Sequence, residues 1–170
     1  MSINYTFEEI YEQLFPLVYR FVIVRVPKHE VEDITAEIMV KVWRALLGFK
    51  EKCSLRTWAL RIAYHQIADY YRSEKHIPIL SFNEQLDIAQ LKPDHVEQLT
   101  MLSSIQDALA KLPAPQVVVI QLRLVEGLSA VEVANILGTT QQAVDSLLYR
   151  AKKGFRRFYK AENTGGIGDE

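Results

Sequence analysis

The sequence predicts an all-α protein of two small helical domains joined by a flexible linker, the second domain being a helix-turn-helix. Apolar residues recur at helical spacing in several segments, and no segment shows the alternation of a β-strand. Glycine (7) and proline (6) are few among the 170 residues, which also favours helices. From Ser73 to His95 the periodicity fades. Because so long a structureless loop is uncommon inside one compact domain, a domain boundary is expected there.

Three helices are expected in the first domain. The first covers residues 6–26, and the second covers residues 30–47 and ends at Gly48, a residue suited to the position after a helix. Ser54 is a suitable N-cap for the third helix, which is expected over residues 55–72.

The second domain is expected to begin with helices over residues 100–112 and 117–125, which Pro113 and Pro115 separate. The whole chain then divides into a first domain, a linker, a second domain and a tail, at residues 1–75, 76–98, 99–160 and 161–170.

The stretch "GLSAVEVANILGTTQQAVDSLLYRAKKGFRRF", residues 127–158, is typical of a helix-turn-helix. Ser129 and Glu132 form a capping box at the start of a short helix, and Gly138 can adopt the left-handed conformation of the turn. Thr139 or Thr140 caps the second, longer helix. The same pattern also fits two ordinary bundle helices, so alone it leaves both interpretations open.

Charge is distributed unevenly along the chain. The formal net charge is −1, but residues 40–75 carry eight bases and three acids, and residues 149–160 carry six bases and no acid. Two basic segments in an acidic background indicate contacts with nucleic acid. On a helical wheel, the longer helix separates an apolar stripe from a polar face that could enter a major groove.

Several classes of function are not supported by the sequence. The four histidines are dispersed, and there is no Gly-rich phosphate loop and no metal-binding motif, so we expect neither an enzyme, nor a cofactor, nor a metal site. Cys53 is the single cysteine, which fits a reducing compartment. No segment approaches the ~18 apolar residues of a membrane span, and no signal peptide is visible, so a cytoplasmic protein is expected.

Two motif blocks in order give a more specific indication. "VEDITAEIMVKVWRALLGF" is followed by "SLRTWALRIAYHQIADYYRSEK", and the helix-turn-helix stretch follows after the linker. Over about residues 6–160 the chain resembles the extracytoplasmic-function (ECF) group of bacterial sigma factors in the sigma-70 family.

The resemblance implies an RNA polymerase sigma factor of the ECF type, which directs promoter-specific transcription initiation and has no catalytic activity. The first domain would be region 2, which binds core polymerase and opens the −10 element, and the second would be region 4, which reads the −35 element. The implied partners are the polymerase core, through its β′ coiled coil and β flap, promoter DNA, and an anti-sigma factor. A free-standing helix-turn-helix regulator, which would bind an operator without polymerase, is the alternative.

The resemblance also implies roles for particular residues. On the second helix it assigns polymerase docking to Asp33, Glu37, Val40, Trp43 and Leu46, although Trp43 would also suit the core. Around the loop and the third helix it assigns −10 contacts to Phe49, Lys50, Ser54, Arg56, Arg61, His65, Gln66, Asp69 and Arg72. Trp58 and Tyr71 are expected in the core.

In the second domain the resemblance assigns −35 contacts to Arg123, Gln141, Gln142, Asp145, Ser146, Tyr149, Arg150, Lys153 and Arg156. Family members often have lysine and arginine where this chain has Asp145 and Leu147. An acid facing the groove repels phosphates but can accept a hydrogen bond from cytosine. We therefore expect an unusual −35 preference or weaker −35 binding.

Overall fold

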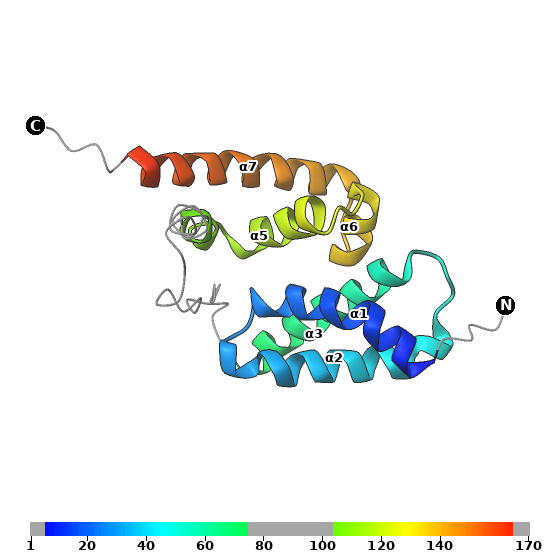
Figure 1. Cartoon of the computed structure of the whole chain (residues 1–170). Helices are drawn as coiled ribbons and strands as arrows, with labels where there is room; N and C mark the ends of the chain where they lie inside the picture. The colour runs from blue at the N-terminus through cyan, green and yellow to red at the C-terminus, as the bar shows by residue number, and fades with distance from the viewer. Residues whose placement is uncertain (1–5, 75–103, 165–170) are drawn as a thin grey trace, which may run out of the picture.

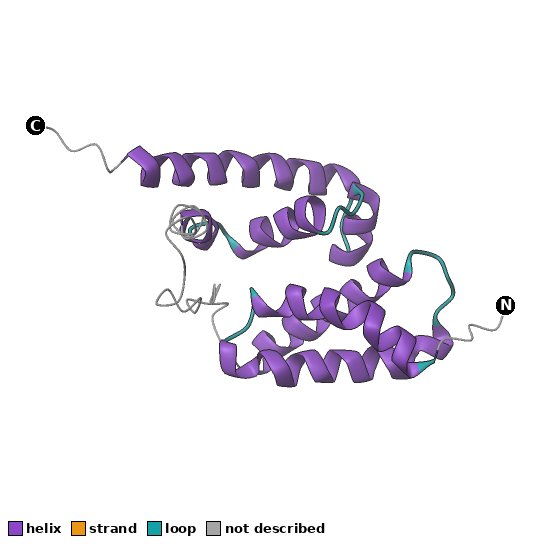
Figure 2. Cartoon of the chain, in the orientation of Figure 1, coloured by secondary structure: helices purple, strands orange, loops and turns teal. Residues whose placement is uncertain are grey.

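A computed structural model describes residues 6–74 and 104–164 of the chain. Every regular element in these two ranges is helical, and neither range contains a strand (Figure 2). The first domain consists of α1 (Phe7–Ile23), α2 (Val31–Ala45) and α3 (Leu55–Glu74), with short 3-10 turns at Lys28–Glu30 and Leu46–Gly48. The all-α prediction and the three helices of the first domain are confirmed.

The core of the first domain forms where one face of each helix meets the other two. α1 contributes Leu14, Val18 and Phe21, all fully buried, and they pack with Ile38 from α2 and Leu60 from α3. Helix starts follow the local sequence. Ser54 caps α3, as predicted, by accepting a hydrogen bond from the Thr57 backbone N–H at 3.1 Å.

The second domain contains helical residues 104–110, then α5 (Ala114–Ile120), α6 (Ala130–Leu137) and α7 (Gln141–Thr164). The helix expected over residues 117–125 is present, but it begins earlier, with α5 at Ala114, and its last part, Gln121–Val125, is a single π-helical turn. π-turns are rare and local, and they change the direction in which the following side chains point. Gln121 begins this turn and Glu126 follows it, and both are buried polar residues that contact the first domain.

The helix-turn-helix is confirmed in detail. The Ser129 hydroxyl accepts a hydrogen bond from the Glu132 N–H at 3.2 Å, and the Ser129 N–H donates to the Glu132 carboxylate at 2.9 Å, which is the predicted capping box. Gly138 ends α6 with φ of 64°, a left-handed conformation that favours glycine. Of the two candidate caps for α7, Thr140 is the one used, because its hydroxyl accepts from the Ala143 N–H at 3.2 Å.

The two domains lie against each other (Figure 1). α6 and the π-helical turn face α3 and α1, whereas α7 runs along the side of the second domain that is turned away from the first. The predicted linker lies outside the described residues, as do residues 165–170 of the predicted tail and the start of the expected helix 100–112. Residues 161–164, expected at the start of the tail, are the end of α7. Among the described residues, no helix is long and apolar enough to cross a membrane.

Candidate nucleic-acid and polymerase interfaces

α7 presents a continuous polar face to solvent. Val144, Leu148 and Ala151 anchor the helix in the core, as the helical wheel predicts. All eight residues assigned to −35 contacts on this helix are exposed: Gln141, Gln142, Asp145, Ser146, Tyr149, Arg150, Lys153 and Arg156. Amides, a hydroxyl and an acid occupy its first turns, and cations follow. The polar side chains at the start of α7 are suited to contact base edges, and the cations further along the helix are suited to contact phosphates.

Arg123, the remaining residue of the −35 set, lies on the π-helical turn. Its guanidinium donates a hydrogen bond to the Leu128 carbonyl, just before α6, and its Nε atom is buried. In this structure Arg123 therefore ties the π-helical turn to the segment that leads into the helix-turn-helix.

The exposed side of α3 carries most of the residues assigned to the −10 element. Arg61, His65, Asp69 and Arg72 are exposed, and Arg72 forms an ion pair with Asp69 at 2.7 Å. A cleft of about 250 Å³ runs along this side, lined by Lys41, Trp58, Arg61, Ile62, His65, Gln66 and Asp69. Cations and an aromatic ring in one cleft are the groups that bind single-stranded nucleic acid.

Trp58, which lines this cleft, forms an aromatic pair with Phe49. The Phe49 ring, at the start of the loop 49–54, packs on the Trp58 ring with centroids 4.9 Å apart, and Lys50 next to it is exposed. Trp58 and Tyr71 are half-buried and pack against the core, as expected, but each keeps part of its ring at the surface. The Tyr71 hydroxyl donates to the Arg25 carbonyl, so it joins the end of α3 to the segment after α1.

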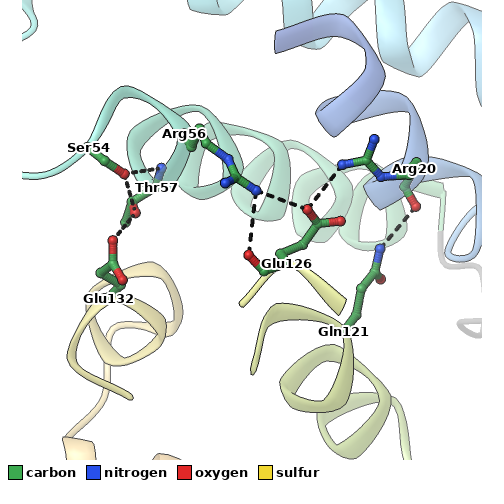
Figure 3. Close-up of polar contacts among 7 residues, drawn as sticks. All are labelled: Arg20, Ser54, Arg56, Thr57, Gln121, Glu126 and Glu132. Carbon is green, nitrogen blue, oxygen red and sulfur yellow. Dashed lines mark hydrogen bonds and ion pairs between the residues drawn. The ribbon is translucent and has the colours of Figure 1, made fainter. Parts of the chain in front are cut away.

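The beginning of α3 is placed differently from the rest of the −10 set. Arg56 forms an ion pair with Glu126 of the second domain at 3.4 Å (Figure 3). Thr57, which bonds to Ser54, also donates to the Glu132 carboxylate at 2.8 Å. Arg56 and Thr57 therefore lie at the contact between the domains. Of the rest of the set on α3, Gln66 is half-buried and Arg61, His65, Asp69 and Arg72 are exposed.

α2 carries the residues assigned to polymerase docking. Asp33, Glu37, Val40 and Trp43 are exposed on it, but Leu46 is only 6% exposed. The docking role of Leu46 is therefore corrected to a core role, because the 3-10 turn at Leu46–Gly48 directs its side chain inward. Trp43 is 38% exposed and meets the Phe7 ring edge-on at 5.2 Å, so it belongs to the surface more than to the core.

An aromatic surface that was not predicted from the sequence lies next to these residues. Phe7, Tyr11, Phe15 and Tyr19 stack along α1, with successive ring centroids 5.8, 4.8 and 5.8 Å apart. They line a groove of about 420 Å³ whose other wall comes from α2 and includes Val40. The four-residue spacing was visible, but it also fits an inner helix face, to which such residues are normally assigned.

The described residues offer no group of three or more histidine, cysteine or acidic side chains placed to hold a metal ion.

Comparison with protein families gives two matches along the chain. Residues 10–77 match the model of sigma-70 region 2, and residues 102–153 match the model of sigma-70 region 4. Similar proteins include the ECF RNA polymerase sigma factor BldN of Streptomyces coelicolor, 28% identical over 156 residues. That match covers 89% of this chain and 59% of BldN, so the chain spans less than two thirds of BldN.

Two Bacillus subtilis proteins are matched over most of their length. The RNA polymerase sigma factor YlaC is 28% identical over 150 residues, covering 85% of this chain and 87% of YlaC. The ECF RNA polymerase sigma factor SigX is 28% identical over 160 residues, covering 89% and 82%.

Solved structures share the fold. CnrH in complex with the cytosolic domain of CnrY superposes with a TM-score of 0.67 at 22% identity, covering 91% of this chain and 88% of that one. The sigma factor RpoE in complex with the anti-sigma factor NepR, from Bartonella quintana, gives 0.69 at 21% identity, covering 91% and 96%. The likeness extends over both helical domains.

Proposed function

This chain belongs to the ECF group of the sigma-70 family of transcription initiation factors, and we propose that it directs RNA polymerase to specific promoters. The observation that carries the proposal is the presence of regions 2 and 4 in order within one chain. We assign region 2 to residues 1–75 and region 4 to residues 99–160, with a linker at 76–98 and a tail at 161–170. The protein acts without catalysis of its own, in the cytoplasm, where it meets polymerase and DNA.

Docking on core polymerase is the first part of the mechanism. Asp33 and Glu37 are exposed on α2 beside Val40 and Trp43, so charge and apolar contact are combined on one helix. Acids on the surface set the register and speed of docking on a basic partner, and the exposed ring adds buried apolar area. We assign this surface to the β′ coiled coil, with region 4 engaging the β flap.

Opening of the −10 element is the second part. Unstacking a base costs energy, and a pocket that stacks and holds the extruded base returns part of that cost. The Phe49–Trp58 pair offers a ring surface for such a base, and Lys50 and Arg61 offer charge for the neighbouring phosphates. His65, Gln66 and Arg72 continue the path of the strand along α3.

Recognition of the −35 element is the third part. The exposed face of α7 is long enough to lie in a major groove, with Gln141, Gln142 and Ser146 toward base edges. Arg150, Lys153 and Arg156 then contact phosphates. The two solved structures named above are each a complex with a second protein, which for RpoE is the anti-sigma factor NepR. We propose an anti-sigma factor as a further partner of this chain.

Run-off transcription with purified core polymerase on genomic fragments tests the proposed function. The full chain is expected to produce promoter-specific transcripts that core polymerase alone does not make. A free-standing regulator would instead bind a DNA operator without polymerase and would add no transcripts. That outcome would replace the present proposal.

Replacement of Asp145 tests whether it sets the −35 preference. Asp145→Asn removes an exposed negative charge from the groove-facing side of α7 while keeping the side chain's size. We expect tighter binding to −35 DNA in general and a change of preference at one base pair, by about 1–3 kcal/mol. Transcription from a library of −35 variants measures both.

Asp107→Asn, which neutralises an exposed acid elsewhere in the same domain, is the matched control and should leave the preference unchanged. An identical −35 preference in Asp145→Asn and the wild type would remove Asp145 from the proposed set of base contacts.

A further inference from the structure

A hydrogen-bonded bridge of polar side chains joins α2 to α3 beside the cleft proposed for the −10 strand. The Gln66 amide nitrogen donates a hydrogen bond to the Glu37 carboxylate at 2.9 Å, and the Gln66 amide oxygen accepts one from the Lys41 ammonium. Glu37 and Lys41 lie one turn apart on α2, whereas Gln66 belongs to α3. Both ends of the Gln66 amide are therefore turned toward α2.

The bridge fixes the place of the Lys41 ammonium. A lysine carries its charge on a long flexible stem, so an exposed ammonium normally samples many positions. Here the Gln66 oxygen holds the ammonium at the cleft of about 250 Å³, which Lys41 helps to line. Glu37 in turn sets the orientation of the amide, because it accepts from the nitrogen end and leaves the oxygen facing Lys41.

Lys41 keeps its charge for an external anion. Among the described residues it forms no ion pair, although Glu37 precedes it by four positions on α2, a spacing that often gives one. Its partner is instead a neutral amide, which takes one N–H donor of the ammonium and leaves the others for an anion. A carboxylate in place of the amide would cancel the charge that a phosphate needs.

The other groups of the cleft favour an anion as well. Arg61 and His65 are exposed there, and Asp69, the one acid among the described residues that line it, forms an ion pair with Arg72 at 2.7 Å. Trp58 adds a ring on which a base can stack. A single strand presents phosphates and base faces together, so it fits a cleft that combines cations with a ring.

We propose that Lys41 contacts a phosphate of the −10 strand and that Gln66 positions Lys41 for this contact. The proposal rests on the sigma-factor function proposed above, and it adds a residue of α2 to a DNA path otherwise built from α3 and the loop before it. Gln66 then acts on DNA through Lys41, and Glu37 acts through Gln66. Since Glu37 also belongs to the surface proposed for polymerase docking, one chain of hydrogen bonds links that surface to the cleft.

Lys41→Gln in the full chain tests the phosphate contact. Binding to a fluorescein-labelled single-stranded DNA of mixed sequence is followed by fluorescence anisotropy over a range of NaCl concentrations. Loss of one phosphate contact should make the slope of log affinity against log salt shallower by about 0.7, and at ~0.1 M salt it should weaken binding about fivefold.

Lys28→Gln is the matched control for the phosphate contact. It removes the same charge from an exposed position of the same domain, but Lys28 is not among the residues that line the cleft. Its slope should stay close to that of the wild type. Equal slopes for Lys41→Gln and Lys28→Gln would overturn the proposed contact, and so would a wild-type affinity that does not depend on salt.

Gln66→Ala tests the positioning role. Lys41 keeps its charge in this variant but is no longer held, so affinity should fall about two- to threefold while the salt slope stays that of the wild type. In the double variant Lys41→Gln/Gln66→Ala the loss should equal that of Lys41→Gln alone, because Gln66 has nothing left to position. Alanine favours the helix, so circular dichroism should show wild-type helicity in each variant.

The outcomes separate this proposal from the function on which it rests. If the wild type gives promoter-specific transcripts but Lys41→Gln keeps the wild-type slope, the phosphate contact is wrong and the function stands. Losses that add in the double variant would mean that Gln66 contacts DNA directly, and its positioning role would be wrong. If the wild type gives no transcript, the sigma-factor function fails, whereas the slopes still decide whether Lys41 meets a phosphate.

Discussion

Reversal of the two acids on α2, in the variant Asp33→Lys/Glu37→Lys, is expected to weaken binding to core RNA polymerase by at least about tenfold. Both carboxylates are exposed and lie beside Val40 and Trp43, so they would meet a basic partner directly. Placing lysines there turns attraction into repulsion and slows association as well. Competition of the variant against labelled wild type for purified core polymerase measures the loss.

The fold should survive this change. Glu37 accepts a hydrogen bond from Gln66 at 2.9 Å, but that contact is exposed, and exposed polar contacts contribute at most about 1 kcal/mol. Circular dichroism should therefore show the wild-type helix content and a similar thermal midpoint. Glu12→Lys reverses one exposed acid on α1 and is the control for a charge reversal outside α2. If the double variant competes for core as well as Glu12→Lys does, the docking assignment is wrong.

Phe21→Ala is expected to lower the free energy of unfolding by about 3–5 kcal/mol. The Phe21 ring is fully buried in the core of the first domain, and its removal leaves a cavity among closely packed neighbours. The ring also lies 3.8 Å below the guanidinium of Arg25, which donates to the Phe21 carbonyl. Urea unfolding followed by circular dichroism measures the change.

Arg25 adds to the expected loss. Burial lowers the pKa of its guanidinium to about 9, an effect that the nearby Glu126 carboxylate opposes, so Arg25 remains a cation at neutral pH. Without the Phe21 ring this buried cation loses one of the few groups that compensate its desolvation. The whole stability of a domain is about 5–15 kcal/mol, so Phe21→Ala removes a large share.

Phe7→Ala is the matched control for this prediction. It deletes the same ring from the same helix, but at a position that is 46% exposed, so the loss should be much smaller. Equal losses for Phe21→Ala and Phe7→Ala would contradict the assignment of Phe21 to the core.

Local features of the fold could be predicted from the sequence because their causes lie within a few residues. The Ser129–Glu132 capping box, the left-handed Gly138 and the Ser54 cap each depend on one turn of chain, and all three are present. The apolar stripe of α7 likewise follows from helical spacing, which is why its eight polar residues were correctly placed at the surface.

Features that depend on distant parts of the chain could not be predicted in this way. In the sequence, nothing distinguishes Glu126 from an exposed acid before a glycine. Its partners in the structure, Arg20 and Arg56, lie 106 and 70 positions away along the chain. The same contact directs the charge of Arg56 toward Glu126 in the second domain. The π-helical turn that precedes Glu126 has no marker in the sequence. A charged residue is buried only where folding assembles its counterions, and that assembly is a property of the packed domains.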